Sequence, residues 1–250
     1  MVTIKSKREI EIMREAGKIL GTVMRDLSKE VKAGMSTYTL DKIGEEMIRS
    51  YGCIPSCKGY EGYPAAFCIS VNEAIVHSIP SKKIILKEGD IVSLDACLEY
   101  KGYQADAART VGVGQISKEA AQLIEVTKQS FFEGVKYAKE GCHLHEISNA
   151  IAAYNESYGY GVIRELVGHG IGAEMHEDPP IPNFTQQRRG IKLYEGMTLA
   201  IEPMVSAGGY EVEWLDDDWT AVTADRSLAA HYENTVLVTK NGPEILTLVE

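Results

Sequence analysis

Residues 90–110 read DIVSLDACLEYKGYQADAART and predict two neighbouring strands joined by a tight turn. The turn candidate is Tyr100-Lys101, which separates a largely apolar run from a second strand-like run. If these two residues form the loop, Asp95 faces Asp106, because both are equally far from it. Opposed Cβ atoms lie roughly 4.5–5.5 Å apart, and like charges at that spacing destabilise a strand pair. The hairpin therefore needs something that compensates the two carboxylates.

Three arrangements would meet that need. A divalent cation suits two hard oxygen donors well. The two acids could instead be protonated, or the hairpin could be looser and leave both carboxylates solvated. The hairpin alone does not decide between these three.

The segment that precedes the hairpin recurs in the second half of the chain, and so do two other segments. Each recurrence has the same offset in residue number, 107, from 141 − 34, 158 − 51 and 193 − 86. The matching pairs are Gly34 with Gly141, Tyr51-Gly52 with Tyr158-Gly159, and Leu86-x-Glu88-Gly89 with Leu193-x-Glu195-Gly196. The same offset relates Asp95 to Glu202 (202 − 95). A constant offset predicts two structurally similar halves, roughly 5–110 and 115–240.

Both halves show the same order of elements, with helices before strands. Apolar residues at helical spacing predict helices over 5–28, 37–51, 117–139 and 143–158. Strand patterns follow over 67–71, 74–79, 90–100, 104–113, 197–205 and 231–239. No linker rich in Pro, Gly or Ser separates the halves, so we expect one pseudo-symmetric α+β domain over 1–250. A site between the halves would draw its residues from both.

Composition narrows the class of protein. The chain has 250 residues, 44% of them hydrophobic and 25% charged, as in ordinary globular proteins. A formal net charge of −10 argues against a nucleic-acid surface, which is expected to be basic. The N-terminal stretch over 1–20 mixes charges with apolar side chains, so we expect no signal peptide, no membrane partner and a cytoplasmic location. The five cysteines are odd in number and irregularly spaced, which favours free thiols.

Further candidates for chemistry lie in three later segments. Residues 165–180, ELVGHGIGAEMHEDPP, place His169 between two glycines that would let the backbone approach a ligand closely. Glu202 lies in LAIEPM and Glu233 in HYENTVLV, both mainly apolar strand patterns where an unpaired carboxylate is costly to bury. Each residue alone is more often structural. Four acids in strands plus a histidine are less easily explained that way.

An oxygen-rich set with one imidazole suits two adjacent divalent ions better than one structural zinc ion. Two-metal sites with ions about 3.5–4 Å apart occur in aminopeptidases, where they activate water. We therefore expect a hydrolase.

Five motifs carry a family resemblance, in the order SVNEAIVHSIP, DIVSLDACLEYKGYQADAART, VGHGIGAEMHEDP, LAIEPM and SLAAHYENT. With these motifs the chain closely resembles the type I methionine aminopeptidases over essentially its entire length. The resemblance implies the pita-bread fold, in which two helix pairs cover a curved antiparallel sheet. It also implies an apolar methionine pocket.

Residue by residue, the resemblance implies three groups. The metal ligands are Asp95, Asp106, His169, Glu202 and Glu233, with Asp106 and Glu233 bridging both ions. The catalytic groups are His77, His176 and Glu202, and both histidines also contact substrate. The methionine pocket is lined by Tyr60, Tyr63, Cys68 and Trp219.

The implied activity is removal of the initiator methionine from nascent proteins and peptides that have a small second residue. Two divalent ions, Co, Mn, Fe or Zn, would activate the water, and the ligand types do not choose among them. Any ribosome contact would be weak or would use this same domain. Two alternatives stay open at this point. One is a proline-specific peptidase with the same metal set, and the other is a binding protein that has lost catalysis.

Overall fold

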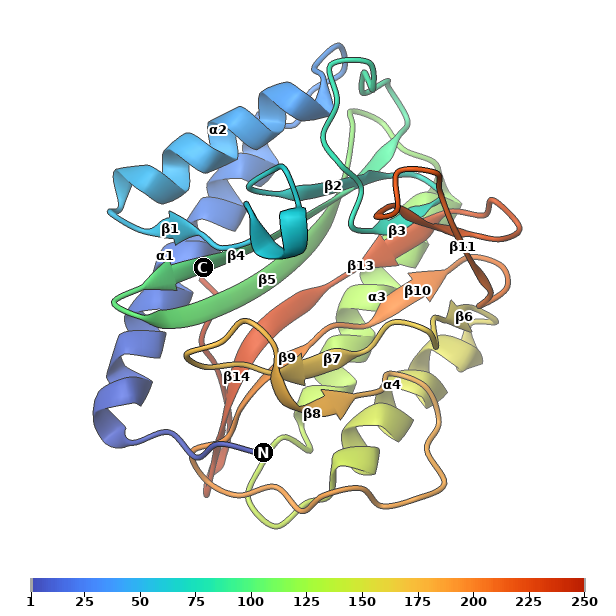
Figure 1. The fold of residues 1–250 in the computed structure, drawn as a ribbon. Coiled ribbons are helices and arrows are strands. Elements are labelled where there is room, and N and C mark those ends of the chain that lie inside the picture. The colour runs from blue at the N-terminus through green and yellow to red at the C-terminus, as the bar shows by residue number, and fades with distance from the viewer. Residues whose placement is uncertain (1, 250) are drawn as a thin grey trace.

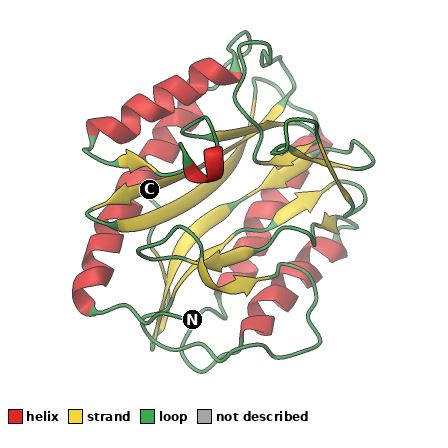
Figure 2. Ribbon diagram, viewed as in Figure 1, coloured by secondary structure: helices red, strands yellow, loops and turns green. Residues whose placement is uncertain are grey.

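The computed structural model describes residues 2–249, so the first and last residues of the expected 1–250 domain lie outside it. A curved sheet crosses the centre of the molecule, and the α-helices lie behind and beside it (Figure 1). Figure 2 shows this division, with the strands gathered in front of the helices. The α-helices are α1 Lys7–Glu30, α2 Thr37–Ser50, α3 Lys118–Val135 and α4 Leu144–Ser157. They lie close to the four predicted ranges.

The first helix shows why these ranges form helices. Ser6 accepts a hydrogen bond from the Glu9 backbone, and the Glu9 side chain accepts one from the Ser6 backbone, which completes a capping box. Along α1, Met13, Leu20 and Leu27 are fully buried and recur at the spacing of one helix face. None of the helices within residues 2–249 is both long and apolar enough to cross a bilayer.

The offset of 107 recurs in the backbone. The first residues of α2 and α4 differ by 107 in residue number (144 − 37), and so do their last residues (157 − 50). Before α2, the N–H of Gly34 donates to the Leu86 carbonyl over 2.8 Å, and before α4 the N–H of Gly141 donates to the Leu193 carbonyl over 3.0 Å. Gly34 has φ of 87° and Gly141 has φ of 94°. Both positions favour glycine because a Cβ is strained in this left-handed region.

The sheet joins the two halves through antiparallel pairs. Its main path runs β1-β4-β5-β14-β9-β7-β8, with β2 paired to β4 and β15 paired to β14. These strands are β1 Ile54–Pro55, β2 Cys68–Val71, β4 Ile91–Tyr100, β5 Tyr103–Gly112, β7 Gly168–Gly170, β8 Glu177–Ile181, β9 Thr198–Ile201, β14 Glu233–Thr239 and β15 Gly242–Ile245. Strand β5 of the first half pairs with β14 of the second, so the halves meet at this ladder.

Two smaller sheets flank the main one. The first has the order β13-β10-β6 and the second the order β11-β12-β3. Their strands are β3 Ala74–Val76, β6 Gly161–Val162, β10 Met204–Ser206, β11 Val212–Trp214, β12 Ala221–Thr223 and β13 Ala229–His231. A short 3₁₀ helix, η1 Tyr60–Gly62, lies between β1 and β2.

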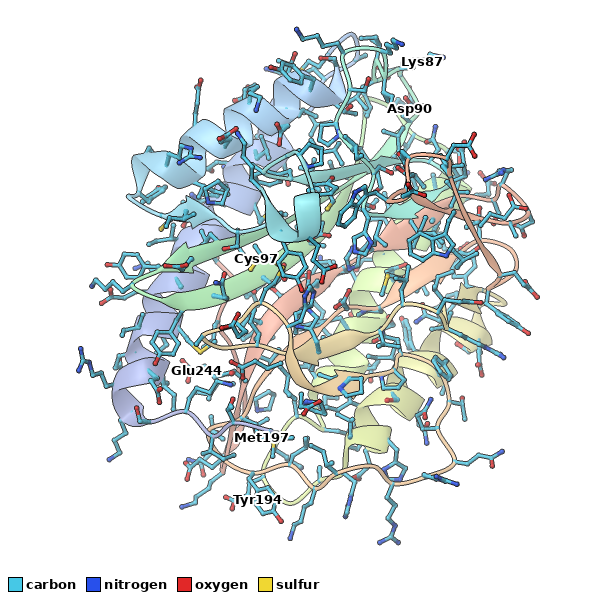
Figure 3. All side chains as sticks on the ribbon, viewed as in Figure 1. Lys87, Asp90, Cys97, Tyr194, Met197 and Glu244 are labelled. Carbon is cyan, nitrogen blue, oxygen red and sulfur yellow. The ribbon has the colours of Figure 1, made fainter. Side chains whose placement is uncertain are left out.

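The hairpin register differs from the prediction by one residue in the turn. Tyr100 pairs with Tyr103, so the loop is Lys101-Gly102 and not Tyr100-Lys101. Both loop residues have positive φ, as a type I′ turn requires, and glycine accepts this best at the second position. Asp95 consequently pairs with Ala108, and Asp106 with Cys97, which is labelled in Figure 3. The expectation that Asp95 faces Asp106 directly is therefore wrong.

The two aspartates nevertheless remain on one face of the hairpin. Moving the loop by one residue shifts the register by two, and side chains alternate with a period of two. Asp95 and Asp106 are diagonal neighbours across β4 and β5 as a result.

Two predicted strands are split into two, and a third ends early. Strand 197–205 is split between β9 and β10 at Glu202-Pro203, because proline has no N–H to donate to a ladder. Strand 231–239 is split at Tyr232, which lies between β13 and β14. Strand 74–79 ends at Val76, because His77 has φ of 60°, outside the extended region that regular strand residues adopt.

The apolar core fills the space between the helices and the main sheet. One cluster packs α1 and α2 against β4 and β5 and includes Leu20, Phe67 and Leu94, all fully buried. The other packs α3 and α4 against β9 and β14 and includes Phe131, Ile151 and Val236. Each half thus anchors its own helix pair, which holds the strands that carry the candidate site in place.

Candidate metal centre

A cavity of about 430 Å³ opens where the two halves meet. Its lining takes in all of the residues predicted above for ligation, catalysis or methionine binding: Tyr60, Tyr63, Cys68, His77, Asp95, Asp106, His169, His176, Glu202, Trp219 and Glu233. They come from separate strands and loops spread over 174 positions (233 − 60 + 1), so only the folded chain brings them together.

The innermost group consists of Asp106 on β5, His169 on β7 and Glu233 on β14. All three are buried, with between 2% and 9% of their surface exposed. One ligand atom of each lies within 4.8 Å of the other two, a spacing that could hold a metal ion. Asp95 on β4 and Glu202 after β9 line the same cavity outside this tight group. Oε1 of Glu202 lies 3.6 Å from Nε2 of His169.

Burial makes the ionised carboxylates costly. It raises the pKa of Glu202 to about 8 and that of Asp95 to about 6, where the nearby Glu202 charge also contributes. Burial and then mutual repulsion raise the pKa values of Asp106 and Glu233 as well. Four acids held so closely favour either protons or a bound cation.

No lysine or arginine within residues 2–249 forms an ion pair with these four carboxylates. Arg109 donates to the carbonyls of Ala108 and Glu233 and to Oδ1 of Asn234, and its charge acts on Glu233 without a direct ion pair. The ion pairs that these carboxylates form are with histidines. One arginine charge does not balance four buried acids, and oxygen donors with one imidazole suit divalent ions.

His169 is prepared to act as a ligand. Its Nδ1 lies 2.9 Å from the Gly170 carbonyl, so Nδ1 carries the proton and Nε2 keeps a free lone pair. Burial, followed by the neighbouring His176, lowers the pKa of His169 to about 4. The imidazole is consequently neutral at physiological pH, as metal coordination requires.

The glycines beside His169 lie against neighbouring backbone. A Cβ on Gly168 would lie 2.4 Å from the Ala200 carbonyl oxygen, and one on Gly170 would lie 2.1 Å from that of Asp178. Both positions therefore require glycine so that β7 can pack closely against β8 and β9. Close approach of this backbone to a ligand stays a prediction.

The other two predicted histidines approach the cavity from opposite halves. His77 follows β3 in its left-handed conformation, and burial lowers its pKa to about 4. Nδ1 of His176 lies 2.8 Å from the hydroxyl of Tyr60, and its ring centre lies 4.3 Å from that of His169. A strained backbone of the His77 kind is found most often at functional sites.

The expected methionine pocket forms a wall of the same cavity. The rings of Tyr63 and Trp219 meet edge to face, with centres 5.0 Å apart. Tyr63 donates to the Ser78 carbonyl over 2.9 Å, which fixes its ring, and Cys68 packs in the same small apolar cluster. Tyr60 is more exposed, and its hydroxyl is engaged with His176.

Sequence reasoning missed one residue near the carboxylates. His231 ends β13, is 1% exposed, and places Nε2 3.6 Å from Oε2 of Glu202. The sequence clue to His231 was its position two residues before Glu233. Side chains two residues apart along a strand point to the same face. Residues that line the cavity and were not foreseen are Cys57, Glu61, Val76, Glu165, Leu166, Val167 and Met204.

Comparison with known proteins decides the family. Residues 11–240 match the model of metallopeptidase family M24. The chain is 56% identical to a methionine aminopeptidase of Clostridium acetobutylicum, with all of both chains covered. The chain belongs to the methionine aminopeptidases of metallopeptidase family M24. This confirms the predicted enzyme class, a metal-dependent aminopeptidase and hydrolase.

Solved structures confirm the pita-bread fold. The crystal structure of methionine aminopeptidase from Thermotoga maritima superposes with a TM-score of 0.97 at 44% identity, with complete coverage of both chains. An Xaa-Pro dipeptidase from Bacillus anthracis reaches a TM-score of 0.76 at 25% identity, and the match covers 99% of this chain but 62% of that one. The proline-specific alternative therefore shares the fold but is the more distant match.

Proposed function

We propose that two divalent cations are held by a shared ligand set: Asp95, Asp106, His169, Glu202 and Glu233. With them the enzyme removes methionine from the N-terminus of peptides and nascent chains. The observation that carries this proposal is the buried group of four carboxylates that no lysine or arginine of residues 2–249 pairs with. Asp106 and Glu233 would be shared by both ions, since their ligand atoms lie within 4.8 Å of each other and of that of His169.

Two such ions lower the pKa of a water molecule and stabilise negative charge on oxygen. Glu202 moves the proton. Its carboxylate accepts a proton from the attacking water and returns it to the departing amine. The carboxylate lies on the cavity wall, where its Oε1 faces His169.

His77 and His176 orient the substrate. Tyr60 donates its hydroxyl proton to Nδ1 of His176, so that Nε2–H points away from Tyr60 and donates to the carbonyl oxygen of the scissile bond. A donor aimed at developing negative charge stabilises the transition state more than the ground state. His77 lines the cavity beside Val76 and contacts the same amide group.

The wall formed by Tyr63, Cys68 and Trp219 receives the methionine side chain, with Tyr60 at its exposed end. An unbranched thioether adapts well to an aromatic and sulfur-lined pocket. We expect a small second residue in the substrate, as the family resemblance implies. Carboxylate and imidazole donors accept Co, Mn, Fe or Zn, and availability decides which is held.

Nascent chains as substrates imply a cytoplasmic enzyme. A formal net charge of −10 opposes a strong contact with ribosomal RNA, so any ribosome contact is weak and uses this domain.

The test compares Met-Ala-Ser with an Xaa-Pro peptide, before and after exhaustive dialysis against chelator. We expect hydrolysis of Met-Ala-Ser, loss of that activity in the dialysed protein, and its return with added divalent cation. Metal content measured on protein purified anaerobically gives the stoichiometry. Full activity without metal, or a preference for the Xaa-Pro peptide, would contradict the proposal.

A further inference from the structure

His231 is a buried histidine whose ring has no hydrogen-bond partner. Its side chain is 1% exposed, and neither Nδ1 nor Nε2 is hydrogen-bonded to any residue of 2–249. Leaving a polar group buried and unpaired is destabilising. Most buried polar side chains are paired, so an unpaired one needs an explanation.

The backbone around His231 is held firmly. The N–H of His231 donates to Oγ1 of Thr110 over 2.8 Å, and that hydroxyl donates to the His231 carbonyl over 2.9 Å. Thr110 also shares a hydrogen bond with Ser93 on β4, and His231 pairs with Met204 of β10. Contacts with β4, β5 and β10 therefore fix the backbone from which the ring extends.

The ring points at the carboxylate of Glu202. Its Nε2 lies 3.6 Å from Oε2 of Glu202, while Oε1 of Glu202 lies 3.6 Å from Nε2 of His169. Glu202 thus stands between two imidazoles, one facing each oxygen. His169 needs its Nε2 lone pair for a cation, so it cannot donate to Glu202, whereas the His231 ring has no competing partner within residues 2–249.

We propose that His231 is a positioning residue for Glu202, donating from Nε2 to Oε2 and leaving Oε1 to face His169 and the cations. The proposal rests on the role of Glu202 given above. It assigns different tasks to the two oxygens of one carboxylate. A fixed carboxylate keeps its reactive oxygen within reach of the proton it must move. Groups that hydrogen-bond a metal ligand in this way typically contribute roughly 10- to 100-fold in metal affinity or activity.

The test uses three variants of His231. The amide nitrogen of glutamine reaches about as far as Nε2, whereas that of asparagine reaches about as far as Nδ1. We therefore expect H231Q to keep turnover within a few-fold of wild type, and H231N and H231A to lose roughly 10- to 100-fold in kcat. The KM for Met-Ala-Ser should change little, because His231 does not line the methionine pocket.

A matched control removes another histidine. His145 on α4 also has a buried ring nitrogen, Nδ1, without a partner in residues 2–249, but it lies outside the cavity. H145A should leave kcat unchanged. Titration calorimetry with Mn²⁺ on each apo variant gives a second readout, and we expect H231N and H231A to bind Mn²⁺ more weakly than H231Q does.

Combination with E202Q separates the two proposals. If His231 acts through Glu202, adding H231A to E202Q causes no further loss in kcat. A full additional loss, or equal kcat values for H231Q and H231N, would overturn the positioning role. Near wild-type turnover of E202Q alone would instead overturn the proton-carrying role of Glu202. If H231A does not fold, the comparison of H231Q with H231N still decides the matter.

Discussion

Asp95 and Glu202 occupy equivalent places in the two halves of the chain (202 − 95 = 107), but their backbones differ. Asp95 lies in the middle of a ten-residue strand and is paired on both sides, with Cys68 of β2 and Ala108 of β5. Glu202 lies in the break between β9 and β10, immediately before Pro203. The same position is thus part of a continuous strand in one half and of a strand interruption in the other.

The difference assigns different chemistry to the two carboxylates. A strand paired on both sides holds Asp95 still, which suits a ligand that only contributes charge. At the break, the Glu202 carbonyl accepts from Asn183 over 3.0 Å instead of from a neighbouring strand. In the metal-free site, burial raises the pKa of Glu202 to about 8 and that of Asp95 only to about 6, so Glu202 holds a proton more readily. The repeat therefore supplies two equivalent acids, Asp95 and Glu202. The interruption between β9 and β10 allows Glu202 to carry a proton as well as to bind a cation.

The largest effect should come from the carboxylates where the halves join. Asp106 on β5 and Glu233 on β14 belong to strands that pair with each other. Changing Asp106 to Asn or Glu233 to Gln should remove at least one cation and lower turnover by more than roughly 10⁴-fold, about 5.4 kcal/mol of barrier. His169→Ala should be milder, because that residue binds one ion. Metal analysis and single-turnover rates check this, and equal metal loss in all three variants would rule out bridging.

The variants Asp95→Asn and Glu202→Gln test most directly whether the two equivalent carboxylates have different tasks. We expect Glu202→Gln to keep at least one ion and to bind methionine normally while turnover falls by roughly 10²–10⁴-fold, because an amide cannot accept the proton. Asp95→Asn should mainly weaken cation binding, with turnover within about tenfold of wild type once cation is saturating. Calorimetry and steady-state rates on the same preparations measure both. If saturating cation rescues both variants equally, the division of tasks is wrong.

Much of this site could be predicted because its residues lie in motifs of specific order. The existence of the helices also followed from local patterns, since Met13, Leu20 and Leu27 recur along one face of α1. What failed depended on single backbone conformations. The hairpin loop required positive φ at Lys101 and Gly102, and only the paired strands reveal that this register was chosen.

Other failures arose from tertiary contacts. No local pattern shows that His77 has φ of 60° and ends its strand. The glycines flanking His169 could be recognised as special, but their close contact with the backbone of β8 and β9 appears only in the folded chain. His231 went unnoticed because a histidine in an apolar strand becomes significant only when its ring is known to face Glu202.

A smaller effect should appear in the pH dependence of stability in the metal-free enzyme. The folded-state pKa of Glu202 is raised from 4.5 to about 8, and those of Asp106 and Glu233 are also raised. The folded state therefore binds more protons than the unfolded state over this window, and stability falls as pH rises. The buried histidines of the site, whose folded-state pKa values are lowered to about 4, have the opposite effect near their ordinary pKa of about 6.5, but from about pH 7.5 upward they are neutral in both states.

One additional bound proton is worth about 1.4 kcal/mol per pH unit. We expect the Tm of chelator-treated enzyme to fall by several degrees, on the order of 3–6 °C, between pH 7.5 and pH 9. Glu202→Gln should reduce this slope, while Asp95→Asn should hardly change it, because the Asp95 pKa of about 6 lies below the window. Saturating cation should flatten the curve. A Tm that rises with pH in the metal-free enzyme would contradict the expected sign.

The smallest expected effect comes from making the same substitution at equivalent positions of the two halves. It tests whether the two halves of the repeat are equally stabilised at these positions. Gly34 and Gly141 each precede a helix, have φ of 87° and 94°, and leave open space where a Cβ would lie. Alanine at either position meets no steric clash, so its cost is the left-handed backbone alone, about 1–2 kcal/mol. The lower entropy of the unfolded chain offsets part of that.

We expect each alanine variant to lose about 1 kcal/mol of unfolding free energy, with no change in kcat because neither glycine lines the cavity. Urea unfolding measures the two losses, and asparagine at the same positions should cost less, since it tolerates positive φ. The two hydrogen bonds to Leu86 and Leu193 are equivalent, so the two losses should agree within about 0.5 kcal/mol. A large loss at one glycine and none at the other would show that the halves share their sequence spacing but not their energetics, and the comparison of Asp95 with Glu202 would then lose its structural basis.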